Sequence, residues 1–372
     1  MKLRAISLVI LILLLCSCAK KESAVSTNVS YNSLVFSETK KPLYAVQYNI
    51  KKAGSYNLIT IADKEKFLLV PQNASVPSEI PDDVTVLRQP LDKTYLVSTA
   101  SMDFMVALNI MDKLRFSGTK EWYIEEAVSA MKNGSLLYAG KYSAPDFELL
   151  VSEGCNFAVE NTMIYHKPEI KEKLEELGIP VMVDYAGNEK HPLGRLEWIK
   201  LYGLLFDREK EADAFFENRL KSIKKVLNGK QTDVRVAFFY VNSSGAINVR
   251  TSEDYVVKMI ELAGGRYAQG ETLKNEKNSS TMNIQMEDFY LSTVDADVLV
   301  YNSAIDGTVD DVSDLIAKNA LFSDFKAVKN GRVYRTEPEF LQKTTETAAI
   351  ISELNKIITN KDDKLTYLTK LE

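Results

Sequence analysis

Residues 207–227 constrain the fold more than any other stretch, because their pattern predicts one uninterrupted helix. Asp207 is placed to cap the first turn, acidic residues follow it, and lysines gather at the far end, as the helix dipole favours. The apolar residues recur at spacings of three and four and form one stripe: Ala212, Phe215, Phe216, Leu220, Ile223 and Leu227. Such a helix is about 30 Å long. Strand-like and helix-like runs alternate on both sides of it, so it is predicted to join two α/β halves.

The size and composition of the chain agree with two globular lobes. A chain of 372 residues is long for one core and suits two domains. Its hydrophobic fraction of 45% and charged fraction of 26% are ordinary for a folded protein. The net charge of −5, with no basic cluster, argues against nucleic acid as a partner.

The first residues carry an export signal. Two basic residues precede a short apolar run, and the segment Leu15-Cys16-Ser17-Cys18 follows, which resembles the cleavage box of bacterial lipoproteins. Residues 1–17 are therefore predicted to be a lipoprotein signal peptide, and Cys18 the lipidated N-terminus. An ordinary signal peptide or a signal anchor is the alternative. Cys155 is then the one unmodified thiol, expected to be a small buried apolar residue, so no disulfide framework is predicted.

The remaining chain divides around the long helix. Residues 18–42 are polar and rich in Ser, Thr and Lys, and are expected to be a flexible tether. Residues 43–206 are predicted to form an N-terminal α/β lobe, decorated near its start by an added β-hairpin, and residues 228–372 a C-terminal α/β lobe. The predicted fold is α/β, with two Rossmann-like lobes, each with a central, mostly parallel sheet, joined by one interdomain helix.

Two sequence segments, one in each half of the chain, resemble a pattern found in a known family. The segment PDFELLVSEGCNFAVE in the first half and IQMEDFYLSTVDADVLVY in the second each place a Glu on a short helix that leads into a buried strand. With the two lobes, the long helix and the lipoprotein signal, they resemble the class III substrate-binding proteins of ABC importers, which deliver ferric siderophores, haem and cobalamin to a membrane permease. The resemblance implies that Glu148 and Glu287 dock onto permease arginines. Alternatively, each is only a Glu that the helix dipole favours in a first turn.

The resemblance also implies a ligand cleft between the lobes, lined by loops at the carboxyl ends of strands. Aromatic and Arg side chains suit a bulky, planar or anionic chelate. The candidates are Thr99, Ser101, Trp122, Tyr123, Tyr142, Tyr165, His191, Arg195, Tyr240, Asn242, Arg250, Asn302 and Glu337. For any single aromatic residue a place in the core or on the surface is the alternative, and Arg195 could face solvent or pair with Glu197.

The histidine count limits the ligand class. The chain has two, His166 and His191, whereas a site for bare Zn²⁺ or Mn²⁺ usually takes three His and a carboxylate. No metal site is predicted, and a preformed chelate is favoured. Haem stays open, because one axial ligand would suffice, with His191, Tyr165 and Met282 as the candidates.

The sequence contains no phosphate-binding loop, nucleophile elbow, H-E-x-x-H motif or Cys/His cluster, so no catalytic residue and no enzyme activity are predicted. The predicted function is capture of a metal chelate, a ferric siderophore-type complex above haem or a corrinoid, and delivery to a two-subunit permease with a cytoplasmic ATPase. The protein is expected to be a monomer, lipid-anchored outside the cytoplasm, with no cofactor apart from the lipid on Cys18. A metallocluster oxidoreductase, for which only Cys155 is available, and a structural or adhesive lipoprotein are the competing hypotheses.

Overall fold

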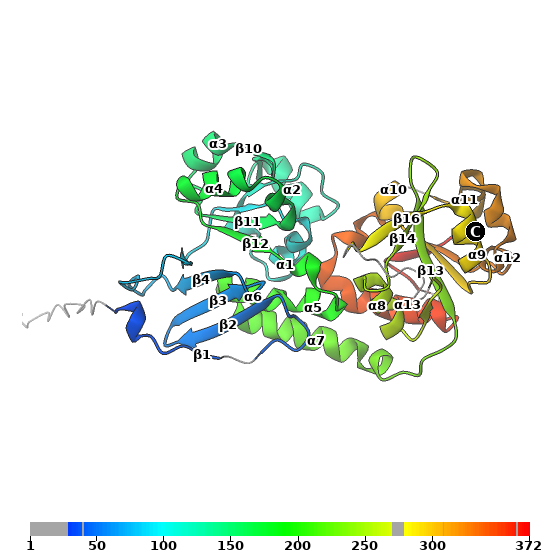
Figure 1. The fold of residues 1–372 in the computed structure, drawn as a ribbon, viewed down its shortest axis with the longest axis horizontal. Coiled ribbons are helices and arrows are strands. Elements are labelled where there is room, and N and C mark those ends of the chain that lie inside the picture. The colour runs from blue at the N-terminus through cyan, green and yellow to red at the C-terminus, as the bar shows by residue number, and fades with distance from the viewer. Residues whose placement is uncertain (1–28, 39–40, 270–278, 308, 362–363) are drawn as a thin grey trace, which may run out of the picture.

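The computed structural model describes residues 29–38, 41–269, 279–307, 309–361 and 364–372. Figure 1 shows an N-terminal lobe, a C-terminal lobe beside it and a separate sheet below the N-terminal lobe, with helix α7 (Glu209–Leu227) along the underside. The predicted signal peptide and Cys18 lie outside the described residues. Across the described ranges, no helix combines the length and apolar character that a membrane span requires.

The N-terminal lobe is built on a five-stranded sheet in the order β12-β11-β6-β7-β8, in which all pairs are parallel. Its strands are β6 (Thr94–Leu96), β7 (Leu114–Ser117), β8 (Leu137–Tyr138), β11 (Phe157–Asn161) and β12 (Val181–Asp184). The helices of this lobe are α1 (Met102–Ala107), α2 (Glu125–Asn133), α3 (Phe147–Ser152), α4 (Pro168–Glu176), α5 (Pro192–Glu197) and α6 (Ile199–Leu205), and a short hairpin comprises β9 (Gly140–Lys141) and β10 (Ala144–Pro145). Because the strands run parallel, the loops at their carboxyl ends share one edge of the sheet.

The C-terminal lobe has a mixed seven-stranded sheet in the order β16-β14-β13-β17-β18-β19, with β15 also paired to β13. Its strands are β13 (Arg235–Val241), β14 (Ile247–Arg250), β15 (Arg266–Tyr267), β16 (Thr281–Ile284), β17 (Val298–Tyr301), β18 (Val333–Thr336) and β19 (Leu368–Lys370). Its helices are α8 (Tyr255–Leu262), α9 (Met286–Thr293), α10 (Ser303–Asp306), α11 (Val312–Lys318), α12 (Lys326–Lys329) and α13 (Thr347–Ile358). The predicted arrangement of two α/β lobes joined by one long helix is confirmed.

The segment before the N-terminal lobe is larger than the predicted hairpin. It forms a five-stranded accessory sheet of β1 (Ser37–Glu38), β2 (Tyr48–Ala53), β3 (Tyr56–Ile61), β4 (Glu65–Val70) and β5 (Val84–Arg88), in that order. The first four strands form an antiparallel meander, which local alternation can indicate, but β5 returns through a long connection to pair parallel with β4. Such a return has no local sequence signal, so only the hairpin part was predicted.

The predicted flexible tether of residues 18–42 was too long. A short 3-10 helix, η1 (Tyr31–Ser33), and strand β1 lie within it, and Ser30 forms a β-bridge with Ser78. The polar composition misled the prediction, because the few apolar residues among these, such as Tyr31, Leu34 and Phe36, pack partly buried against the accessory sheet, and backbone pairing holds the rest.

Helix α7 packs against α6 of one lobe and α13 of the other. Of its predicted stripe, Ala212, Phe216 and Ile223 are fully buried, and the others are partly buried against the same core. Helices α6 and α7 approach closely at Gly203, where an added Cβ would lie 2.5 Å from the Ala212 Cβ. The apolar core that includes α7 extends into both lobes.

One detail of the predicted helix was wrong. Asp207 does not cap α7: the helix begins at Glu209, Arg208 occupies the cap position without a side-chain cap, and Asp207 has a left-handed φ of 64°. Helix α6 ends at Leu205, so the chain reverses within three residues, and Asp207 serves that reversal. Asp tolerates this conformation better than most residues, which explains an acidic residue here without a capping role.

A charge placed in the buried stripe of α7 should destabilise both lobes together. Phe216→Asp buries an unpaired carboxylate where a fully buried ring packs, and we expect a loss of about 4 kcal/mol or more in the free energy of unfolding. Ala214→Asp introduces the same charge on the exposed face of the same helix and is the matched control. Chemical denaturation followed by circular dichroism measures both, and equal stability of the two variants would show that α7 does not connect the lobes.

The central sheet of the N-terminal lobe contains an unusual carboxyl group. Glu160 on β11 is fully buried, and neither of its oxygens has a hydrogen-bond partner in good geometry among the described residues. Burial raises its pKa from about 4.5 to about 8, an effect that the nearby backbone N–H of Asn161 only partly offsets. The folded protein therefore keeps this carboxyl protonated at neutral pH.

The stability of the protein should depend on pH through Glu160. The unfolded carboxyl ionises near pH 4.5 and the folded one near pH 8, so this group makes the free energy of unfolding fall as the pH rises between these values. Glu160→Gln should remove most of that decline and raise the stability at pH 8 by a few kcal/mol. Melting temperatures from pH 5 to 9 measure it, with the exposed Glu172→Gln as the control. Parallel pH curves for Glu160→Gln and the wild type would contradict the prediction.

Candidate functional site

The carboxyl edge of the N-terminal sheet faces the C-terminal lobe (Figure 1). The loop after β6 forms the 3-10 helix η2 (Thr99–Ser101), and 3-10 helix η9 (Thr344–Glu346) of the other lobe lies against it. Thr344 Oγ1 donates to the Ala100 carbonyl at 3.1 Å. The buried Asp103 carboxylate accepts from the Thr345 backbone N–H at 2.7 Å and from the Thr345 hydroxyl. These bonds fix the loop after β6 to the C-terminal lobe.

The loop after β12 approaches a second part of the C-terminal lobe. Its shape is set locally: Asp184 accepts from the Ala186 backbone N–H at 2.6 Å, and His191 caps α5 by accepting from Leu193 N–H at 3.2 Å. Arg195 then binds this loop by donating to the carbonyls of Gly187 and Glu189. The loop is therefore held in one shape from both ends before it meets the other lobe.

A cavity of about 540 Å³ lies where this loop meets residues 251–255 and 279–280 of the C-terminal lobe. Its walls are rich in hydroxyl groups, contributed by Tyr185, Thr251, Ser252, Tyr255, Ser279 and Ser280. The Arg195 guanidinium lies 3.5 Å from the centre of the Tyr255 ring, which is a cation–π contact between the lobes. Lys190 and Glu253 form an exposed ion pair that also joins the two walls.

The charged side chains at this cavity are only partly neutralised by partners within the protein. Burial lowers the pKa of Arg195, while Tyr255 and Asp254 act in the opposite direction, so the guanidinium stays charged in a half-buried position. Asp254 caps α8 through the Val256 N–H at 2.9 Å and lies 3.7 Å from Arg250. The cavity thus offers hydroxyls, one guanidinium, one ammonium and carboxylates, which suits a polar solute that carries oxygen ligands of its own.

Of the thirteen cleft candidates from the sequence, a few lie at the junction of the lobes. Arg195 lines the cavity, and the Tyr123 backbone N–H donates to Gln342 Oε1 of the other lobe at 3.1 Å. Thr99 is exposed on η2, next to the Ala100 contact, and Arg250 is buried behind the cavity against Asp254 and the Phe238 ring. The expectation that cleft residues follow the carboxyl ends of strands, called here the strand-end rule, therefore found part of the interface.

Most of the other candidates make hydrogen bonds within their own lobe. Ser101 donates to Asp184, the Trp122 indole donates to Ser117 at 3.2 Å, and Asn242 shapes the turn between β13 and β14. The Asn302 side-chain oxygen accepts from the Thr336 hydroxyl. Glu337 accepts from Thr369 and from Arg335. The Tyr185 hydroxyl donates to the Tyr165 hydroxyl at 2.9 Å. Tyr142 and Tyr240 pack partly buried against the cores of their own lobes.

The sequence reasoning missed several cavity residues. Tyr185 directly follows β12, so the same strand-end rule could have found it. Glu253 just precedes α8 and Tyr255 begins it, and both follow β14, a strand paired antiparallel to its neighbours, where the rule does not apply. Asp103 and Thr345 are 242 residues apart, and no local pattern predicts their contact.

Four exposed apolar side chains follow the carboxyl ends of strands by a few residues in the sequence. Tyr123 follows β7, Met163 and Tyr165 lie on the 3-10 helix η4 (Thr162–His166) after β11, and Ile305 lies on α10 after β17. These side chains are 44% to 58% exposed. Exposed apolar groups at such positions suit contact with the non-polar part of a ligand.

The described residues contain no group of three or more His, Cys, Asp or Glu arranged to hold a metal ion. Of the haem-ligand candidates, His191 uses Nδ1 as a helix cap and stacks on Tyr44 at 4.7 Å, and Met282 packs against the C-terminal core. Cys155 is buried as predicted, and burial raises the pKa of its thiol to about 11, which disfavours the reactive thiolate.

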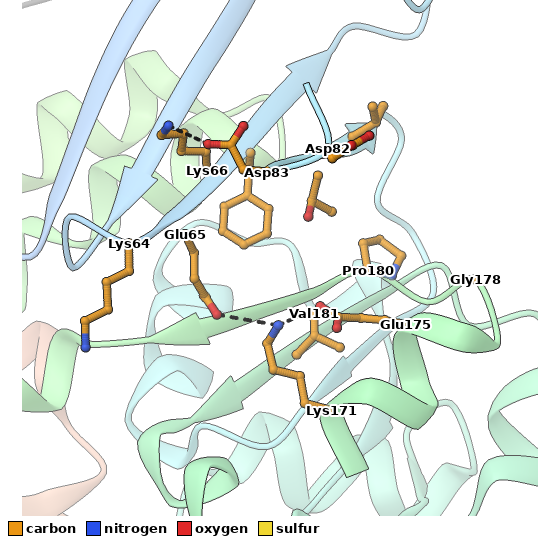
Figure 2. Close-up of a pocket in the computed structure, with 13 residues that line it drawn as sticks. Lys64, Glu65, Lys66, Asp82, Asp83, Lys171, Glu175, Gly178, Pro180 and Val181 are labelled. Carbon is orange, nitrogen blue, oxygen red and sulfur yellow. Dashed lines mark hydrogen bonds and ion pairs between the residues drawn. The ribbon is translucent and has the colours of Figure 1, made fainter. Parts of the chain in front are cut away.

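A second pocket lies between the accessory sheet and α4, away from the junction of the lobes (Figure 2). It has a similar volume of about 540 Å³, but its charged side chains largely pair with one another. Lys66 contacts Asp83 at 2.7 Å, and Lys171 contacts Glu175 at 2.6 Å and Glu65 at 3.6 Å. With these charges satisfied internally, the pocket is less suited to a charged ligand than the cavity between the lobes.

The two predicted docking residues are exposed, one on each lobe. Glu148 lies in the first turn of α3, which Asp146 caps by accepting from Leu149 N–H at 3.0 Å. Glu287 lies in the first turn of α9. Neither carboxylate forms an ion pair with a residue that the structure describes.

Comparison with known proteins gives a family match and relatives over most of the chain. Residues 158–340 match the family model described as periplasmic binding protein. An uncharacterized lipoprotein of Methanocaldococcus jannaschii is 28% identical over 325 residues, which is 82% of this chain and 74% of the relative. A second uncharacterized lipoprotein of that organism is 25% identical over 348 residues, which is 88% of this chain and 86% of the relative.

Solved structures share the fold at low identity. A periplasmic binding protein of Veillonella parvula has a TM-score of 0.59 at 16% identity, over 72% of this chain and 91% of its own. The periplasmic heme binding protein of Vibrio cholerae also has a TM-score of 0.59 at 16% identity, over 71% and 98%. The petrobactin-binding protein of Bacillus subtilis has a TM-score of 0.56 at 15% identity, over 74% and 93%. Roughly a quarter of this chain lies outside each likeness.

Proposed function

We propose that this chain is a solute-binding protein of the periplasmic binding protein family with the two-lobed class III fold, and that it captures a metal chelate between its lobes and delivers it to a membrane permease. The family match supports the role of a solute-binding protein of the ABC-importer type, and two relatives named as lipoproteins support a place outside the cytoplasm. Anchoring through a lipid on Cys18 belongs to the proposal. The family and its structural neighbours are substrate-binding proteins and not enzymes.

The observation that carries the proposal is the cavity between the lobes. Its walls come from both lobes, and the Arg195–Tyr255 contact crosses it, so a ligand there would touch both lobes at once. That is the geometry a solute-binding protein needs, because the bound ligand then stabilises one arrangement of the lobes.

The side chains favour a preformed chelate over a bare ion. The chain has two histidines, of which His191 uses one nitrogen as a helix cap, so a three-histidine metal site cannot form. A chelate brings its own metal ligands and presents oxygen atoms, which hydroxyls and a guanidinium can bind. The petrobactin-binding neighbour supports a ferric siderophore, and the heme-binding neighbour supports haem as the second candidate. A corrinoid is the third candidate that the class III fold admits.

The ligand itself can be identified on protein purified from its own host. We expect native mass spectrometry to show an organic chelate with bound iron, and the absorption spectrum separates a siderophore complex from haem or a corrinoid. A divalent ion bound without an organic chelator would contradict the proposed ligand class.

Variants in the cavity test where that chelate binds. Tyr255→Ala removes the aromatic wall, and we expect at least about tenfold weaker binding of the chelate identified above, measured by tryptophan fluorescence. Tyr142→Ala is the control, because this tyrosine packs against the core of the N-terminal lobe and does not line the cavity. Equal losses in both variants, or none in Tyr255→Ala, would move the binding site elsewhere.

Docking onto the permease is tested separately from ligand binding. The double variant Glu148→Ala with Glu287→Ala should abolish chelate uptake by cells, because it removes one surface carboxylate from each lobe while the cavity stays intact. The affinity for the chelate in solution should equal that of the wild type. The control pair, Glu172→Ala with Asp295→Ala, removes the same charge from exposed positions elsewhere. Normal uptake by the Glu148 and Glu287 variant would rule out this docking role.

A further inference from the structure

The cavity between the lobes has no surplus of positive charge on its described walls. The charged side chains that line it are three carboxylates and two cations: Glu189, Glu253, Asp254, Lys190 and Arg195. Arg250 lies behind the wall, 3.7 Å from Asp254, and brings the formal charge of this group close to zero. A ligand in this cavity therefore meets as many carboxylates as cations.

Both cations that line the cavity already have partners within the protein. Lys190 forms an ion pair with Glu253. Arg195 donates to two backbone carbonyls of the loop after β12, and one face of its guanidinium lies on the Tyr255 ring. An anion with several charges would lose its water on entering and would find no free cation to replace that water. Such an anion should therefore bind weakly.

The groups that remain available in the cavity are uncharged. They are hydroxyls and side-chain amides that make no hydrogen bond with another described residue, and they belong to Gln47, Asn188, Ser252, Tyr255 and Ser280. A hydroxyl both donates and accepts, and a primary amide offers two donors and one carbonyl oxygen. Groups of this kind match a ligand that is rich in carbonyl oxygens and amide N–H groups and has little net charge.

We propose that this cavity selects ferric trishydroxamate complexes, which are neutral or singly positive, over ferric tris-catecholate complexes, which are trianions, and over haem, whose propionates are anionic. This inference rests on the proposed function and specifies the charge class of the chelate. The hydroxamate oxygens and the amide groups of such a chelator would bind the free hydroxyls and amides of both lobes. The pair of Lys190 and Glu253 can stay intact while this ligand is bound.

Recognition without net charge has a signature in the salt dependence of binding. Salt screens the attraction between charges, but it has little effect on hydrogen bonds between neutral groups. We expect the affinity for ferrichrome, a neutral trishydroxamate complex, to change less than about twofold between low and physiological ionic strength. A much larger loss of affinity would show that charge attraction dominates the binding, which would overturn the inference.

The charge class is tested with defined probes on the purified protein. Quenching of tryptophan fluorescence measures binding of ferrichrome, of ferrioxamine B as a cationic trishydroxamate complex, of ferric enterobactin as a tris-catecholate complex, and of haem. We expect both trishydroxamates to bind at least about tenfold more tightly than ferric enterobactin or haem. Equal or tighter binding of either anionic probe would show that the cavity does not select by charge.

A variant of the ion pair tests whether this cavity is responsible for the selection. Glu253→Gln removes one carboxylate and frees Lys190, so the ratio of the affinity for ferric enterobactin to that for ferrichrome should rise about tenfold. Glu176→Gln is the matched control, because it removes the same charge from an exposed pair with Lys173 on α4, and its ratio should equal that of the wild type. Melting curves check that both variants are folded. An unchanged ratio in Glu253→Gln, or an equal rise in the control, would overturn the inference.

The outcomes separate this inference from the function on which it rests. If the anionic probes bind best, the charge class is wrong and the capture of a chelate stands. If none of the probes binds, the chelate on protein purified from its own host decides. A trishydroxamate there supports the inference, whereas an anionic chelate or a corrinoid overturns it and leaves the proposed function standing. Host-purified protein that carries no chelate and binds none of the probes would overturn both.

Discussion

Burial of one face of α7 is the constraint on which the two-lobed arrangement depends. Phe216 and Ile223 pack in a core that includes residues of both lobes, and Ala212 meets α6 at Gly203 without room for a side chain there. Because α7 contacts α6 and α13 along its length, the lobes cannot rotate freely about the connection. The walls of the cavity between them are therefore positioned by the packing of this helix and not by the loops alone.

Buried carboxylates attach the accessory sheet to the N-terminal lobe through hydrogen bonds. Glu197 on α5 accepts from the backbone N–H groups of residues 43–45 at 2.7 to 3.0 Å, and Glu189 accepts from Val46, Gln47 and the Trp198 indole. The backbone carbonyl of the same Glu189 accepts from Arg195. Glu189 thus connects the segment that leads into β2 of the accessory sheet with the arginine of the cavity, so the accessory sheet is part of the support of the site.

The sequence predicted what depends on local periodicity. The apolar stripe of α7 and the alternation of strands and helices in both lobes follow from local patterns, and the structure confirms them. The cavity does not follow from such patterns, because Arg195 and Tyr255 meet only after both lobes have folded against α7. Asn302 and Glu337 satisfied the strand-end rule, yet their side chains are used inside the C-terminal lobe, which depends on hydrogen-bond partners that sequence spacing does not reveal.

A stiff connection also limits how the lobes could separate to release the ligand proposed above. Because α7 resists bending, release requires small movements that separate the contacts across the lobes, rather than a wide hinge opening. Those contacts differ in strength: the buried Asp103–Thr345 bonds are costly to break, whereas the exposed Lys190–Glu253 pair at the cavity contributes little. The more easily broken contact therefore lies on the cavity side of the junction.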